Sequence, residues 1–264
     1  MYPILFESAY FTIHSLWLFV ALALIVGTFS FIALGLKNGL KLQFLSENAF
    51  KILVFAMIGS RLIAIISNWS NFFYEYSSTT FLQIFKIWDK GFSLWGGVVI
   101  GIVTLYYVCK KNEQDFYKWL DSLFPAFLIG IAVSAIGLFL DGSIYGNETS
   151  LPWGFNFESP AIKYTVPIHP TQIYILLFSV TLAVTLILVR HNKFFEKSGN
   201  LAIFGTSAFA LFFFLQEFLR GDDVTEIFGI RVSMIIAALA FISSLIFGLL
   251  RLKSEGQNQK HVTK

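Results

Sequence analysis

Long apolar runs separated by short polar stretches dominate the chain. Each run can cross the roughly 30 Å hydrocarbon core of a bilayer as a helix that rises about 1.5 Å per residue. The runs occupy residues 11–35, 49–67, 92–109, 119–140, 169–189, 201–219 and 229–250. They lack the alternation of apolar and polar residues that marks the strands of a membrane barrel, so we predict an all-α fold class with seven transmembrane helices.

Composition agrees with a polytopic membrane protein. The chain is 56% hydrophobic and 13% charged, far from the averages of soluble domains. Basic residues gather in alternate connections: Lys37, Lys41 and Lys51; Lys110, Lys111 and Lys118; Arg190, Lys193 and Lys197; and Arg251, Lys253, Lys260 and Lys264. Because basic residues in short loops stay in the cytoplasm, we expect an outer N-terminus and a cytoplasmic C-terminus. The net charge of +3 calls for no nucleic acid partner.

The connections suggest one transmembrane domain over residues 1–264. Two of them are long and are expected at the outer face, at residues 68–91 and 141–168. The polar residues 252–264 predict a disordered cytoplasmic tail. Cys109 is the only cysteine, which excludes a disulfide within the chain, and we interpret it as an inert core thiol.

Polar residues collect at one depth, in the outer half of the predicted helices. They are His14, Arg61, Asp141, Tyr145, His169, Gln172, Glu217 and Arg220. An ionisable side chain within a membrane costs about 2.5–3.5 kcal/mol even on insertion scales, so such a cluster indicates a functional site. By itself it predicts binding of an anionic headgroup or a polar peptide at the outer leaflet.

Structural alternatives exist for these residues. Arg61 could extend to the headgroups, although Gly59 before it permits close approach of a helix. Glu217 and Arg220, three residues apart, could form an ordinary helix-end ion pair. Asp141 with Gly142 could be a helix cap and turn, and His14 could be an interfacial histidine. Asp222 and Asp223 could belong to a solvated loop, an interpretation that suits Asp223 better.

Six short motifs occur in order along the chain. They are "IHS" at 13–15, "GSRL" at 59–62, "IWDKGFSLWGG" at 87–97, "GSIYGNETSLPWGF" at 142–155, "VPIHPTQIY" at 166–174 and "EFLRGDD" at 217–223. Together they resemble the prolipoprotein diacylglyceryl transferase family. The resemblance implies a protein of the bacterial inner membrane whose site faces the outer leaflet. It also implies transfer of a diacylglyceryl group from phosphatidylglycerol to the lipobox cysteine thiol in the signal peptide of a preprolipoprotein.

The resemblance also implies roles for individual residues. Arg220 would bind the phosphate and Glu217 would orient Arg220. His14 and His169 are the available proton acceptors, between which the sequence does not choose. Substrate contacts are expected from Arg61, Gly96, Gly97, Asp141, Tyr145, Gly146 and Gln172. The nucleophilic thiol belongs to the substrate, so no catalytic cysteine is needed, and no cofactor or metal is expected.

Several family positions are altered in this chain. Ala135, Leu138, Asp141 and Ser143 replace polar residues before the tyrosine-glycine pair, so a second phosphate-binding arginine is missing there, and Arg61 is a possible substitute. Trp95 replaces a histidine, and Leu16 with Trp17 replaces a tyrosine-glycine pair. Losing one such contact commonly costs about 10²–10³ in rate. A non-catalytic homologue that binds phospholipid or lipopeptide is therefore the first alternative, and a small transporter, disfavoured by the lack of an internal repeat, is the second.

Overall fold

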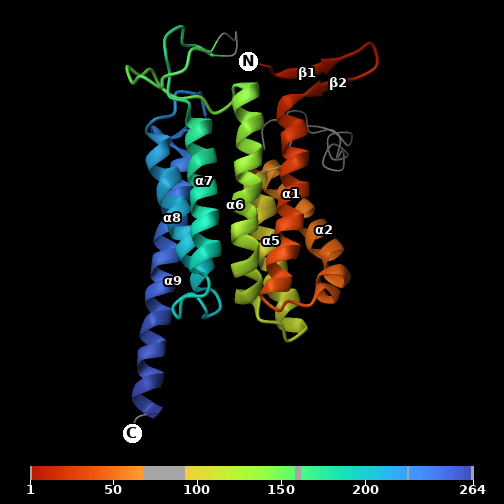
Figure 1. Cartoon of the computed structure of the whole chain (residues 1–264), viewed down its shortest axis with the longest axis vertical. Helices are drawn as coiled ribbons and strands as arrows, with labels where there is room; N and C mark the ends of the chain where they lie inside the picture. The colour runs from red at the N-terminus through yellow and green to blue at the C-terminus, as the bar shows by residue number, and fades with distance from the viewer. Residues whose placement is uncertain (1, 68–92, 158–161, 225, 263–264) are drawn as a thin grey trace. The chain divides into compact units, whose positions relative to one another are not determined.

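The computed structural model describes residues 2–67, 93–157, 162–224 and 226–262 (Figure 1). These residues form seven α-helices and two short antiparallel ribbons. The helices are α1 (Ser15–Lys37), α2 (Leu42–Ser67), α5 (Leu94–Lys111), α6 (Phe116–Asp141), α7 (Thr171–Val189), α8 (Asn200–Glu217) and α9 (Val232–Val262). The ribbons pair β1 (Ile4–Glu7) with β2 (Thr12–His14), and β3 (Glu226–Ile227) with β4 (Ile230–Arg231).

The helices identify a polytopic membrane protein. Six of them, α1, α2, α6, α7, α8 and α9, are long and apolar enough to cross a membrane. The all-α prediction is thus confirmed for the described residues. The count of seven spans, the orientation of the termini and the single domain stay predictions.

The helices form two compact units, residues 1–39 with 117–264, and residues 40–116. In the first unit, α1 and α6 approach each other through glycines. A Cβ on Gly130 would lie 3.3 Å from the Ala23 carbonyl oxygen, and one on Gly137 would lie 2.6 Å from the Phe19 Cβ. Small residues allow this approach because lipid tails supply no hydrophobic force between helices, so close packing has to hold them together.

A leucine-rich core joins α6, α7 and α8 in the same unit. Its buried members are Leu128, Leu182, Ala183, Leu186 and Leu201. The first turn of α8 is capped from α6, since a carboxylate oxygen of Asp121 accepts the Ala202 amide at 2.8 Å. The other face of α8 packs along α9 (Figure 1). α8 ends at Glu217, where the polar residues of interest begin.

The second unit contains α2 and α5, which pack closely. A Cβ on Gly96 would lie 2.5 Å from the Gly59 carbonyl oxygen, and one on Gly59 would overlap the Ile100 side chain. The prediction that Gly59 permits close approach of a helix is confirmed. Gly96 takes part in the same packing, whereas a Cβ on Gly97 would meet Ser60 only at an ordinary 3.5 Å.

The helix ends differ from the predicted runs in several places. Residues 11–14, at the start of the first predicted run, belong to the β1–β2 ribbon, and α1 begins at Ser15. Its backbone amide donates to the Pro3 carbonyl at 2.9 Å, so the ribbon directs the chain into the helix. α9 continues to Val262, past the start of the predicted tail at residue 252. The predicted outer loop at 68–91 lies outside the described residues.

Candidate functional site

A tight turn follows α6 and is held by the start of α7. Gly142 has φ +83°, the left-handed conformation common after a helix, and its amide donates to Leu138 at 2.9 Å. Ile144 also has a positive φ, +59°, which is rare for a β-branched residue. The Thr171 hydroxyl donates to the Ile144 carbonyl, and Gln172 Nε2 donates to the Ser143 carbonyl at 2.7 Å. Two side chains of α7 therefore impose an unfavourable backbone conformation, which is typical of functional sites.

Three of the family motifs meet through their backbones just beyond this turn. The Gly146 amide donates to the His169 carbonyl at 3.1 Å, and Gly146 also forms a β-bridge with Arg220. The Gly221 amide donates to the Tyr145 carbonyl at 2.9 Å. Segments some 75 residues apart in sequence are thus fixed side by side, with Arg220 on one of them.

Four charged side chains form a network at the end of α8. Arg220 donates from Nη1 to Glu217 Oε1 at 2.6 Å, from Nε to Asp222 Oδ1 at 2.9 Å and from Nη2 to Asp222 Oδ2 at 2.5 Å. Arg231, from β4, donates from Nη1 to Asp222 Oδ1 at 3.2 Å and lies 3.5 Å from Glu217 Oε2. The side chains of Glu217, Arg220, Asp222 and Arg231 are only 1%, 10%, 15% and 15% exposed. At this burial the pairs are weakly screened by solvent.

The network shifts the pKa values of its members. Burial by itself would raise the pKa of Asp222, but the hydrogen bonds and charges of Arg220 and Arg231 lower it below its ordinary value. Burial would lower the pKa of Arg220, and the hydrogen bonds and charges of Asp222 and Glu217 raise it instead. Both groups are therefore held in their charged forms.

The interpretation of Asp222 and Asp223 as a solvated loop is wrong for Asp222, whose side chain lies in the network and is only 15% exposed. It fits Asp223, whose side chain is 89% exposed and pairs with Lys163 at 3.0 Å.

A chain of hydrogen bonds ends on His169. Trp153 Nε1 donates to the Tyr174 hydroxyl at 2.9 Å, and that hydroxyl lies 3.1 Å from His169 Nδ1. Burial lowers the pKa of His169 below its ordinary value of 6.5, so the ring is neutral at pH 7.

Buried acceptors lie next to these groups. Gln172 is fully buried, and Gln216 donates from Nε2 to the Thr171 carbonyl at 3.0 Å. Within the described part of the chain, the side-chain carbonyl oxygens of both glutamines accept no hydrogen bond. They could accept one from a hydroxyl group of a ligand. No group of three or more His, Cys, Asp or Glu in that part is placed to hold a metal.

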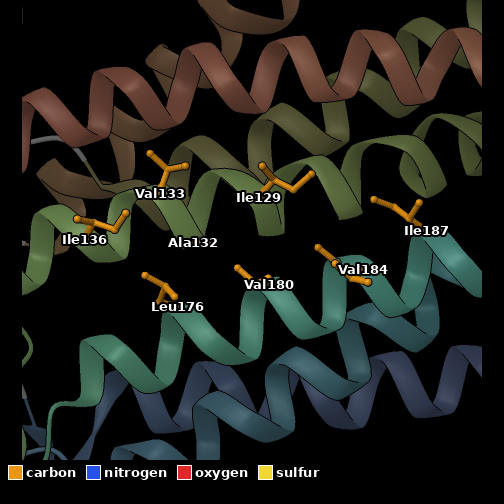
Figure 2. A pocket seen from close by; sticks show the side chains of 9 residues that line it. Ile129, Ala132, Val133, Ile136, Leu176, Val180, Val184 and Ile187 are labelled. Atoms are coloured by element: carbon orange, nitrogen blue, oxygen red, sulfur yellow. The ribbon is translucent and has the colours of Figure 1, made fainter.

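An apolar groove runs between α6 and α7 (Figure 2). It has a volume of about 380 Å³ and is lined by Ile129, Ala132, Val133, Ile136, Leu176, Val180, Ala183, Val184 and Ile187. From Leu176 to Ile187 it extends about 16 Å along α7, at 1.5 Å per residue. Leu176 is one helical turn from Gln172, so the groove begins next to the polar residues.

The first unit brings together most of the predicted site residues. Tyr145, Gly146, His169, Gln172, Glu217 and Arg220 share the contacts above, and Asp141 ends α6 and accepts a hydrogen bond from Ser143. His14 is exposed on β2, and no described hydrogen bond links it to Arg220. Arg61, Gly96 and Gly97 lie in the second unit, so their part in the site stays a prediction. The Trp95 side chain lies outside what the structure describes.

Sequence reasoning missed Arg231, and it did not assign roles to Asp222, Trp153 and Tyr174. Asp222 and Arg231 carry a usable signal, because Asp222 is a charged residue between two apolar runs and Arg231 is a charged residue at the start of the run 229–250. Trp153 and Tyr174 fall inside the motifs at 142–155 and 166–174, but they resemble interfacial aromatic residues.

Comparison with known proteins agrees with this arrangement. The family model described as prolipoprotein diacylglyceryl transferase matches residues 3–250. The chain belongs to this family. Proteins named phosphatidylglycerol–prolipoprotein diacylglyceryl transferase are 27% identical over 257 residues in Clostridium tetani, 26% over 244 in Rhodococcus jostii and 25% over 247 in Mycobacterium bovis. The matches cover 97%, 86% and 88% of this chain, and 100%, 66% and 52% of those three proteins. The resemblance to the prolipoprotein diacylglyceryl transferase family is thus confirmed at low identity.

Proposed function

We propose that this chain transfers the diacylglyceryl group of phosphatidylglycerol to the lipobox cysteine thiol of a preprolipoprotein. In this reaction a carbon–sulfur bond forms at the glycerol carbon that carries the phosphate. The carbon–oxygen bond to the phosphate breaks, and its electron pair leaves with glycerol phosphate. The thiol proton passes to a base. The observation that carries the proposal is the backbone crossing of Gly146, His169 and Arg220, which brings three family motifs to one place beside an apolar groove.

Arg220 is the group that would bind the phosphate. A guanidinium offers parallel donors that match two phosphate oxygens, and its charge stabilises the negative charge that grows on the leaving group. Glu217 holds Nη1 at 2.6 Å and so fixes the plane of the guanidinium. The predicted orienting role of Glu217 is consistent with this contact.

His169 is better placed to donate a hydrogen bond than to accept the thiol proton. The Tyr174 oxygen receives the Trp153 N–H, so the Tyr174 hydroxyl hydrogen can point to His169 Nδ1. A neutral ring with Nδ1 as acceptor carries its proton on Nε2, where it can donate to a headgroup oxygen. His14 is then the candidate base of the two histidines.

The groove between α6 and α7 would hold one acyl chain of the donor. All nine lining residues are aliphatic, and the groove begins one turn from Gln172. A phospholipid could place its headgroup at Arg220 and a tail in this groove. We place the site at the outer leaflet, with seven spans, an outer N-terminus and an inner-membrane location.

The test is mass spectrometry of a synthetic lipobox peptide incubated with the purified protein and phosphatidylglycerol in detergent micelles. We expect the peptide to gain the mass of one diacylglyceryl group on its cysteine. A matched peptide with serine in place of that cysteine should gain nothing. An unmodified cysteine peptide, with phosphatidylglycerol still bound, would instead favour the non-catalytic lipid-binding homologue. No transfer and no binding would contradict both.

A further inference from the structure

Asp222 occupies the Nε–Nη2 side of Arg220, where two parallel donors could bind a phosphate. Its two carboxylate oxygens accept from Nε and Nη2 at 2.9 and 2.5 Å, the parallel two-bond arrangement that a phosphate also forms with arginine. Nη1 donates to Glu217 at 2.6 Å, so three of the five N–H groups of Arg220 are bound to carboxylates. A donor phosphate can therefore form the parallel pair of bonds with Nε and Nη2 only by replacing Asp222.

Arg231 holds Asp222 from a different direction. Its Nη1 donates to Asp222 Oδ1 at 3.2 Å, and its Nη2 donates to the backbone carbonyls of Asp222 at 2.9 Å and Arg220 at 3.1 Å. These bonds tie the β3–β4 hairpin to the end of α8. Asp222 is shared between two arginines, so it can leave one of them without becoming unpaired.

The charges of the network explain why a second arginine matters. Glu217 and Asp222 contribute two negative charges, and Arg220 and Arg231 contribute two positive charges, so the network is neutral. Without Arg231 the same buried group would carry a net negative charge and would repel an anionic headgroup. An unpaired buried carboxylate is also strongly disfavoured, so Asp222 would hold Arg220 more tightly.

We propose that Asp222 occupies the phosphate-binding position on Arg220 until the donor phosphate displaces it. Arg231 is a positioning residue that keeps Asp222 paired after this displacement. Only hydrogen bonds are exchanged in this step. The inference rests on the proposed function, because it assumes an anionic phospholipid as donor. It gives this chain a second guanidinium at the site, although the chain lacks the arginine that the family pattern has before the tyrosine-glycine pair.

A purely structural role for the network makes a different prediction. If Asp222 and Arg231 only fastened the hairpin to α8, each replacement would weaken folding and function in the same direction. If Asp222 competes with phosphate, its removal should improve donor binding and the removal of Arg231 should weaken it. The opposite signs separate the two roles.

The experiment measures KM and kcat for phosphatidylglycerol with Asp222→Asn, Arg231→Gln, Arg231→Lys and the Asp222→Asn/Arg231→Gln double variant. We expect Arg231→Gln to raise KM by about tenfold with kcat within about twofold, and Asp222→Asn to lower KM by a few-fold, since one buried charge is removed in each. The double variant restores neutrality and should return KM to within about threefold of the wild type. Arg231→Lys keeps the charge and should do the same.

Matched controls come from the neighbouring exposed pair. Asp223→Asn and Lys163→Gln make the same charge changes at side chains that are 89% and 46% exposed, and they should leave KM unchanged. A rise in KM with Asp222→Asn would overturn the proposal, as would a double variant no better than Arg231→Gln.

Binding separates this inference from the proposed function. The shift in unfolding temperature on adding phosphatidylglycerol, compared with zwitterionic phosphatidylcholine, is measured for the same variants. If no variant transfers lipid but the phosphatidylglycerol shift is larger with Asp222→Asn and smaller with Arg231→Gln, the exchange stands and the transferase proposal fails. If transfer occurs but neither KM nor the shift follows this order, the exchange fails alone.

Discussion

The backbone of Gly146 lies directly against His169. A Cβ on Gly146 would be 2.5 Å from the His169 carbonyl oxygen and would overlap the His169 Cβ. The same carbonyl accepts the Gly146 amide at 3.1 Å. No side chain fits between these two residues, so the crossing of the family motifs depends on a glycine at this position.

Gly146→Ala should therefore separate the two segments. The new methyl group meets backbone as well as side chain, and overpacking of this kind costs about 1–3 kcal/mol. We expect a lower unfolding temperature in detergent, together with loss of transfer. The control is Gly101→Ala on α5, where a Cβ would meet only Ala56 Cβ at 3.5 Å. Equal stability of the two variants would contradict the close crossing.

Arg220→Lys should reduce transfer by about 10²-fold or more while the protein still accumulates, because an ammonium group keeps the charge but loses the planar pair of donors. Arg220→Ala should reduce transfer further. Rates are measured by mass spectrometry of the lipobox peptide, with Lys163→Ala as a control at an exposed basic residue. If Arg220→Ala transferred at the wild-type rate, Arg220 would be only a helix-end residue.

His169 should make the fold sensitive to mild acid. Its pKa is lowered by burial, so the unfolded chain binds a proton at a higher pH than the folded chain does. Stability is then lost as the pH falls below the ordinary value of 6.5 toward the folded pKa. Between about pH 7 and about pH 5, the unfolding temperature should fall less in His169→Ala than in the wild type. His191→Ala, which changes an exposed histidine, should behave as the wild type does, and an unaltered acid response in His169→Ala would contradict the assignment.

Filling the groove should impair use of the lipid donor. Val184→Phe places a larger side chain in the groove from a half-exposed position on α7, where it should not disturb the core. We expect KM for phosphatidylglycerol to rise by about tenfold, since an acyl chain would lose several buried methylene contacts. Leu177→Phe adds a ring on the same helix at an exposed residue outside the groove. The prediction fails if both variants change KM equally.

Topology can be tested with reporters. A reporter fused after Lys264 should be active only in the cytoplasm, and one inserted near Glu148 should be active only outside it, because basic residues flank the connections predicted to be inside. Glu148 lies in the same connection as the Tyr145–Gly146 pair. A reversed result would place the polar residues at the inner leaflet.

The helices were predictable because length and apolarity nearly suffice for membrane spans. α7 was predicted from residue 169 and begins at Thr171, and α8 was predicted over 201–219 and covers Asn200–Glu217. The β1–β2 ribbon was missed because its second strand is apolar and therefore looks like the start of a membrane helix. Phe11 and Ile13 extend an apolar run, and only the pairing of residues 4–7 with 12–14 turns the start of that run into a strand, which contains Ile13.

The contacts of the site were less predictable than its members. Glu217 and Arg220 follow from helical spacing, and their ion pair was one of the alternatives considered. Arg231 comes from a different element and joins them only because the β3–β4 hairpin turns back toward α8, which hydropathy does not encode. The pairing of Gly146 with His169 depends in the same way on the path of a connection rather than on any periodic pattern.

The aliphatic lining of the groove affects which acyl chains a lipid donor could carry. A wall made only of isoleucine, valine, leucine and alanine side chains offers no hydrogen bond and no charge. Under the proposed function it would distinguish acyl chains only by their width and length. Choice among donors would then depend on the headgroup end, where the arginines lie. A bacterium that changes the length or saturation of its fatty acids to keep its membrane fluid in the cold could continue to mature its lipoproteins with the same protein.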